Sequence, residues 1–190
     1  MVRWWLPVDV PHSASANSCR AGSEGAGMTT PLTVREPVPG RVILSSCLGD
    51  ISQDKGSELF LPAGLPGFET EHVLLPVEIP ARRPLVFLQS VRSPDVCFVC
   101  LPVSCIVDAP FADISEDDRA GLDLDPGRNL VMGEDHLCLA LLLPCGETVR
   151  TNLDAPIVIN LRNYRCAQIL LEPRHGSRRL TVDGTWEPVC

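Results

Sequence analysis

The sequence predicts a mainly β fold: a small antiparallel β-barrel or sandwich-like domain with one short helix. Three observations lead to this fold class. Short apolar runs of strand length recur from residue 41 onward, turn-forming residues separate them, and a single segment has the signals of a helix. The 18 prolines and 14 glycines in 190 residues also suit short strands broken by turns better than they suit long helices.

Nine runs have the length and composition of strands. In order they are RVILSS (41–46), ELFLP (58–62), HVLLPV (72–77), PLVFLQSV (84–91), VCFVCLPV (96–103), DHLCLALLLP (135–144), VRTNL (149–153), PIVINL (156–161) and CAQILL (166–171). Between the second and third runs, Leu65-Pro66-Gly67-Phe68 predicts a type II turn. Pro66 presets φ at the second position, and Gly67 accepts the positive φ that the third position requires.

One segment, DISEDDRAGL (113–122), predicts a short helix. Ser115 is its expected N-cap, with Asp118 three residues later, and Gly121 is expected to end it. Around this element we expect three regions. Residues 1–38 form a flexible extension in which Met28 is an alternative start, residues 39–180 form the β domain, and residues 181–190 form a C-terminal tail.

The charge is unevenly distributed. The net charge is −8, and eight acids against two arginines lie between Asp113 and Asp135. Such a surface repels nucleic acid and attracts a basic protein, whereas a solvated loop that keeps the protein soluble is the alternative. The acidic residues that would steer a basic partner are Asp113, Glu116, Asp117, Asp118, Asp123 and Asp125.

The cysteines indicate a reducing compartment. Nine is an odd number, and several cysteines lie within apolar runs, where a reduced thiol packs as a small hydrophobe. Cys97 and Cys100 have the spacing of a zinc knuckle, but residues three apart on a strand face opposite sides of the sheet. Because no catalytic motif accompanies any cysteine or serine either, we expect no metal, no cofactor and no enzymatic activity.

Three stretches are more specific than a β-barrel of this kind requires: GLPGFE (64–69), LQSVRSPDVCFV (88–99) and TNLDAPIVIN (151–160). With QILL (168–171) closing the last strand, they resemble the bacterial flagellar assembly factor FliW family over residues 40–180. Cys166 departs from the family, which tends to have glycine there. From these motifs we expect the partner-binding residues to be Gly67, Phe68, Glu69, Gln89, Ser90, Pro94, Asp95, Asn152, Pro156 and Asn160.

The resemblance implies a small cytoplasmic β-barrel-like protein that works by switching partners. It would bind newly made flagellin before export and, when freed, bind the translational regulator CsrA and relieve its repression of flagellin synthesis. Neither a membrane nor direct contact with nucleic acid is implied. The alternative is a small β-barrel module that binds carbohydrate or nucleic acid, although the chain has few aromatic residues for such a surface.

Phe68 has two interpretations at this stage. In the first it folds inward as a plug of the core, as aromatic residues near turns usually do. In the second the turn presents Phe68 and Glu69 at the rim of a groove for the partner, where an apolar anchor lies beside a charge.

Overall fold

The computed structural model describes residues 41–53, 56–107, 114–172, 176–181 and 184–189. Its elements, in chain order, are β1 (Arg41–Ser45), β2 (Gly49–Gln53), β3 (Leu59–Phe60), β4 (Val73–Glu78), η1 (Pro80–Arg82), β5 (Val86–Ser90), β6 (Cys97–Pro102), η2 (Val103–Cys105), α1 (Glu116–Gly121), β7 (His136–Leu141), β8 (Leu143–Cys145), β9 (Thr148–Asn152), β10 (Ile157–Asn160), β11 (Cys166–Gln168), β12 (Ser177–Leu180) and β13 (Trp186–Pro188). The predicted fold class is therefore confirmed.

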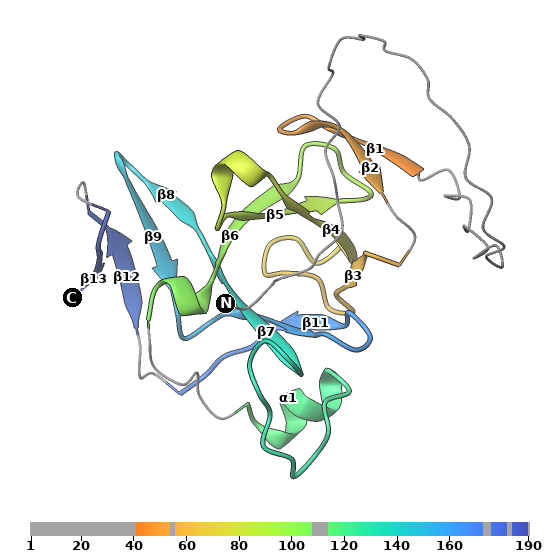
Figure 1. Ribbon diagram of the computed structural model, residues 1–190, viewed down its shortest axis with the longest axis vertical. Coiled ribbons are helices and arrows are strands. Elements are labelled where there is room, and N and C mark those ends of the chain that lie inside the picture. The colour runs from red at the N-terminus through yellow and green to blue at the C-terminus, as the bar shows by residue number, and fades with distance from the viewer. Residues whose placement is uncertain (1–40, 54–55, 108–113, 173–175, 182–183, 190) are drawn as a thin grey trace, which may run out of the picture.

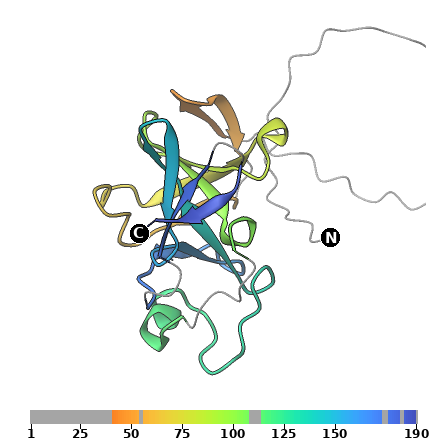
Figure 2. The same cartoon turned by 90° about the vertical axis from the view of Figure 1, so that its left-hand side faces the viewer.

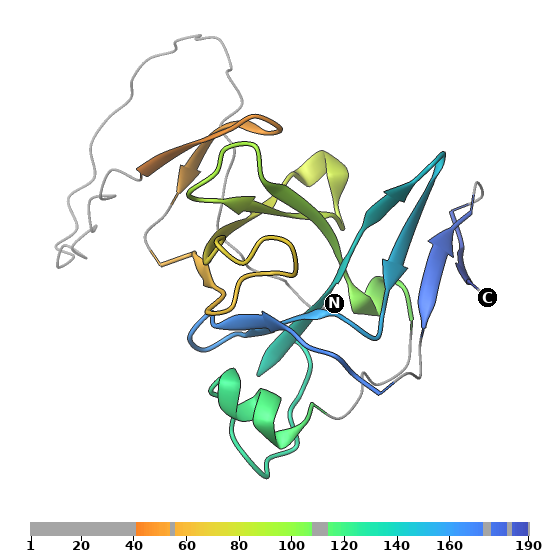
Figure 3. The ribbon, with the colours of Figure 1, turned by 180° about the vertical axis from the view of Figure 1, so that it is seen from behind.

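The described strands form three antiparallel sheets (Figure 1). The largest has the order β11-β10-β7-β6-β5-β4-β3, a second has the order β13-β12-β9-β8, and the hairpin β1-β2 is the third. The main sheet curls until its two edges meet, because Phe60 of β3 forms a parallel bridge with Arg165, and the N–H of Phe60 donates to the carbonyl of Tyr164 at 2.9 Å. The result is a nearly closed barrel, seen from behind in Figure 3.

Three clusters of buried side chains hold this arrangement together. One fills the barrel and includes Leu88, Leu139 and Ile157. A second lies under α1, and the third lies under the hairpin β1-β2. The hairpin and α1 lie at opposite ends of the molecule (Figure 2). Since burial of apolar surface is the main favourable term in folding, the hairpin is held mainly by Ile43 and Ile51 in its cluster. Helix α1 buries none of its own residues and is held through the flanking Ile114, Leu122 and Leu124.

Strand β6 tests the argument about the two cysteines. Phe98 and Cys100 face the cluster inside the barrel, whereas Cys97 faces the cluster under the hairpin. The expected opposite orientation is confirmed, and burial raises the pKa of the Cys97 thiol to about 11. Within the described residues no group of three or more metal-ligating side chains is present.

The short helix forms where the sequence predicts it. The hydroxyl oxygen of Ser115 accepts a hydrogen bond from the N–H of Asp118 at 3.1 Å, which confirms the N-cap. Gly121 is the last helical residue. No helix of the described part of the chain is long and apolar enough to cross a membrane.

Three strands lack an apolar run and are absent from the sequence prediction: β2 (GDISQ), β12 (SRRL) and β13 (WEP). The predicted 135–144 strand is in fact two strands, β7 and β8, which belong to different sheets. The tail expected at 181–190 contains β13, which pairs with β12. The extension expected at 1–38 lies outside the described residues.

Candidate functional site

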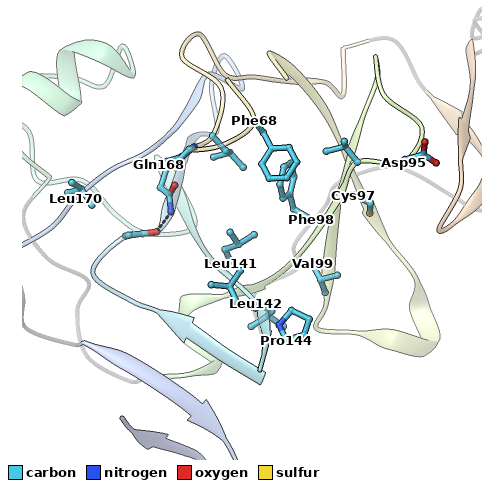
Figure 4. A pocket seen from close by; sticks show the side chains of 15 residues that line it. Phe68, Asp95, Cys97, Phe98, Val99, Leu141, Leu142, Pro144, Gln168 and Leu170 are labelled. Atoms are coloured by element: carbon cyan, nitrogen blue, oxygen red, sulfur yellow. Dashed lines mark hydrogen bonds between the residues drawn. The ribbon is translucent and has the colours of Figure 1, made fainter. Parts of the chain in front are cut away.

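An apolar groove of about 840 Å³ opens on the surface beside the 64–69 turn (Figure 4). This volume is typical of a binding site. Five segments line it: the turn, the start of β6 with the two residues before it, the connection from β7 to β8, Ala155 before β10, and the end of β11 with Leu170. The lining residues that project from these segments include Phe68, Phe98, Leu141, Leu143, Gln168 and Leu170.

The groove is the place where the separate sequence motifs meet. GLPGFE contributes Leu65, Pro66 and Phe68, LQSVRSPDVCFV contributes residues 95–99, and TNLDAPIVIN contributes Ala155. QILL adds Gln168, whose side-chain amide donates to the carbonyl of Ala155 at 2.9 Å, and Leu170. Stretches that are more than 100 residues apart in the chain, such as those of Leu65 and Leu170, therefore form one surface.

The predicted turn is confirmed by its geometry. The N–H of Phe68 donates to the carbonyl of Leu65 at 2.7 Å, and Gly67 has φ +82°. The sequence interpretation overlooked Gly64, which has φ +68°. A Cβ atom at Gly64 would lie 2.6 Å from the carbonyl oxygen of Phe68, whereas one at Gly67 would meet no atom within 4 Å. Gly64 is therefore the more constrained of the two glycines.

Phe68 lies at the rim of the groove. Its side chain is 42% exposed, and its ring packs edge-to-face on Phe98 with the centroids 4.9 Å apart. Leu65, in the same turn, is buried in the barrel and occupies the interior position instead. The interpretation of Phe68 as a core plug is therefore wrong, and the geometry is that of an exposed apolar anchor.

Two carboxylates lie at the groove, one beside Phe68 and one at another place on the lining. Glu69 is exposed, and its Oε1 accepts a hydrogen bond from the N–H of Gly67 at 2.8 Å, which lowers the pKa of Glu69. Asp95 lines the groove and accepts a hydrogen bond from the hydroxyl of Ser46. Beside Phe68, the rim therefore carries the carboxylate of Glu69.

Four of the expected contact residues lie below the surface. Gln89, Ser90, Pro156 and Asn160 are buried. Gln89 accepts from Ser45 Oγ at 2.5 Å and donates to main-chain carbonyls of the 90–96 turn. The side-chain amide of Asn160 donates to the carbonyls of Leu122 and Asp123, both at 3.0 Å. A buried polar side chain bonded internally shapes the fold and is not free to contact a partner. Pro156 is excluded by burial alone, so the expectation is corrected for these four.

Two further expected residues are exposed but bond within the fold, Asn152 in a local turn and Pro94 to the hairpin β1-β2. Asn152 Oδ1 accepts from the N–H of Asp154 at 3.0 Å, and the carbonyl of Pro94 accepts from the N–H of Ser46 at 3.1 Å. Neither lines the groove. Of the ten expected residues, Phe68 and Asp95 line the groove, and Gly67 and Glu69 lie beside it.

Glu71 is a functional neighbour that the sequence interpretation missed. It is 6% exposed, and its carboxylate accepts hydrogen bonds from the hydroxyls of Ser90 and of Ser93, the latter at 2.7 Å. These bonds join the end of the 64–71 loop to the turn after β5, so they fix the position of one wall of the groove. In the sequence, Glu71 is a carboxylate before a strand, and Ser90 and Ser93 form a Ser-x-x-Ser pattern in the next hairpin. Such a pattern is too common to have identified Glu71 as part of the site.

Glu71 predicts a pH dependence of stability. The hydrogen bond from Ser90 is the main cause that lowers its pKa below the ordinary value of 4.5, and burial opposes it. A folded-state pKa below the unfolded one stabilises the protein above the unfolded pKa, and this stabilisation is lost as the pH falls through the folded pKa. We therefore expect Glu71→Gln to lower the free energy of unfolding by about 2 kcal/mol at pH 7, with a smaller difference in acid.

Urea unfolding of the wild type and the variant between pH 7 and pH 3 measures this effect. Glu134→Gln, at an exposed glutamate, is the matched control and should follow the wild type. Parallel curves for wild type and Glu71→Gln over the whole range would contradict the assignment.

The acidic residues of the α1 region divide into two kinds. Asp118 caps the helix with Ser115, Asp123 lies 4.0 Å from the guanidinium of Arg165, and Asp125 pairs with Arg162 at 3.1 Å. Glu116 and Asp117 are exposed and have no ion-pair partner among the described residues. Asp113 lies outside the described residues.

The fold and the groove define a class of protein: a small antiparallel β protein with an open apolar groove of the kind that marks an interaction site. The family model described as FliW protein matches residues 43–181, and the chain therefore belongs to the FliW family.

Relatives of known sequence and structure agree with this family. The chain is 31% identical over 140 residues to the flagellar assembly factor FliW of Oceanobacillus iheyensis, which covers 74% of this chain and 92% of that protein. It is 35% identical over 130 residues to the FliW of Geobacillus kaustophilus, covering 65% and 82%. A crystal structure of the flagellar assembly factor FliW matches with a TM-score of 0.62 at 22% identity, over 72% of this chain and 92% of that one, which establishes the shared fold.

Proposed function

We propose that this protein is a non-enzymatic, cytoplasmic flagellar assembly factor that binds flagellin through the apolar groove before export. When flagellin is drawn off, the freed protein binds and antagonises a CsrA-type translational regulator. Membership of the FliW family supports the role in flagellar assembly. The observation that carries the flagellin proposal is the groove itself, which residues from every family motif line.

The groove has the chemistry needed to hold an unfolded apolar segment. Phe68 and Leu170 are exposed at 42% and 84%, and both line it. Apolar surface of this kind is costly to leave in water, and covering it with an apolar segment of a partner is favourable. In the function proposed here, that partner is flagellin awaiting export, which would offer an unfolded apolar segment.

Leu170→Asp tests this proposal. A carboxylate in the groove cannot be desolvated without cost, so the variant should lose flagellin binding by at least about tenfold while melting like the wild type. Co-purification and calorimetry with the cognate flagellin measure the loss. Leu44→Asp is the matched control, since Leu44 is 63% exposed on the hairpin β1-β2 and does not line the groove. Equal binding by both variants would contradict the proposal.

The proposed binding to a CsrA-type regulator is supported by the negative charge at α1. Glu116 and Asp117 project from a helix with no buried residue and are free to attract a basic RNA-binding protein. Asp118, Asp123 and Asp125 already have partners within the described fold, so we assign the steering role to Glu116 and Asp117.

Neutralising both, as Glu116→Gln with Asp117→Asn, should slow association with CsrA about threefold at low salt without a change in melting temperature. At high salt the variant and the wild type should converge, because screening removes the attraction. Stopped-flow measurements at several salt concentrations give the rates. Superimposable rates at low salt would identify the segment as a solvated loop.

A further inference from the structure

Strand β11 and the residues after it have an open edge. The N–H groups of Ile169 and Leu171 donate to carbonyls on the β10 side, at 3.1 and 2.8 Å. Since the main-chain groups of successive residues in a strand point to opposite sides, those of Gln168 and Leu170 point away from β10. Within the described part of the chain, these main-chain groups have no hydrogen-bond partner.

On the side away from β10, the chain at β11 is bridged to β3 at one position only, at Arg165 just before the strand. The bridge between Phe60 and Arg165 closes the barrel at this point. The chain then leaves β3 as the 61–68 loop, whose Leu65 and Phe68 form the facing wall of the groove. Figure 3 shows this loop beside β11. The two edges of the main sheet are therefore joined at Phe60, and they are apart at Gln168 and Leu170.

This open edge is apolar as well as unpaired. Leu170 is 84% exposed and, with Gln168, lines the groove, while the intervening Ile169 is buried under α1. Natural proteins usually protect an exposed edge strand with charges, proline or a covering segment, because it is a template for strand pairing. Residues 168–170 contain neither a charge nor a proline, and among the described residues no segment pairs with their outward edge.

We propose that the groove receives its partner as an added β-strand, which lies between residues 168–170 and the 64–68 turn, in the place that β3 vacates. The main chain of the partner bonds to the N–H and carbonyl groups of Gln168 and Leu170, and every second side chain enters the groove beside Phe68. The partner segment is thus extended, with apolar residues at alternate positions. This inference rests on the proposed function, in which that segment belongs to flagellin.

Amide hydrogen exchange followed by NMR tests the binding mode directly. In the free protein the amides of Ile169 and Leu171 should be protected, whereas those of Gln168 and Leu170 should exchange rapidly. Saturating flagellin should slow exchange at Gln168 and Leu170 by at least about tenfold and leave the other two little changed. Unchanged exchange at Gln168 and Leu170 in a complex that has formed would overturn strand addition while the proposed function stands. If no complex forms, the proposed function itself fails, and the inference with it.

A pair of variants provides an independent measurement. Leu170→Pro removes the outward N–H and the leucine side chain, whereas Leu170→Ala removes only the side chain. Because the N–H of Leu170 has no partner within the described fold, both variants should fold, which circular dichroism checks. We expect the proline variant to bind flagellin about tenfold more weakly than the alanine variant. Equal affinities of two folded variants would overturn the added strand.

Discussion

Phe68→Ala is expected to weaken flagellin binding by about 30-fold or more, with only about 1 kcal/mol lost from the free energy of unfolding. The binding loss is large because Phe68 is an exposed aromatic anchor at the rim of the groove, and such anchors carry most of the energy of an interface. The stability loss is small because the ring is 42% exposed and its main aromatic contact is the edge-to-face packing on Phe98.

The control for this prediction is Phe60→Ala. Phe60 is 46% exposed, a value close to that of Phe68, but it does not line the groove. Calorimetric titration of flagellin into each variant, with thermal melts of both, separates the two effects. A loss of about 3–5 kcal/mol in stability for Phe68→Ala, the size expected of a buried core aromatic, would contradict this prediction. Normal melting together with normal binding would show that Phe68 takes no part in either.

The second large effect is expected at Gly64. Gly64→Ala should lower the free energy of unfolding by about 3 kcal/mol, from two causes that act together. The positive φ of +68° costs an alanine about 1–2 kcal/mol, and the new Cβ atom would lie 2.6 Å from the carbonyl oxygen of Phe68 and 2.7 Å from the Cα of Glu69. Both neighbours are main chain, so relief requires the turn itself to move.

Gly67→Ala is the matched comparison because it lies in the same loop, also has a positive φ, and has open space around the added Cβ. It should cost only about 1 kcal/mol. Chemical unfolding of the two variants measures the difference. Because a shift of the turn displaces Phe68, Gly64→Ala should also bind flagellin more weakly at temperatures where it is folded. Equal destabilisation by the two substitutions would show that the close contact at Gly64 relaxes without cost.

The sequence predicted the kind of site, a binding surface, but few of the residues that form it. The motif around Phe68 and Asp95 indicated a binding surface, and both residues do line the groove. Gln89 and Asn160, from the other motifs, have the polar side chains expected at an interface, yet each is bonded internally. Amino-acid type alone cannot separate a polar residue that binds a partner from one that satisfies a buried main-chain group.

The errors in the strands predicted from the sequence have a similar origin, since they too depend on tertiary context. The strands β12 and β13 are polar: Arg179 lies opposite Glu187, and β9 pairs along the other side of β12. β-propensity depends strongly on such context. The apolar run at 135–144 appeared as one strand because periodicity does not reveal where a strand leaves one sheet for another.

By itself, the sequence determined the features that depend on neighbours within a few residues. These are the turn at Pro66-Gly67, the N-cap at Ser115 and the order of the apolar strands, together with the motifs typical of the FliW family. Their signals are local, because a β-turn or a helix cap is completed within four residues. The tertiary structure alone decided where the groove lies and which edge of the barrel stays open. Both depend on pairs such as Phe60 with Arg165, which are more than 100 residues apart and meet only when the sheet curls upon itself.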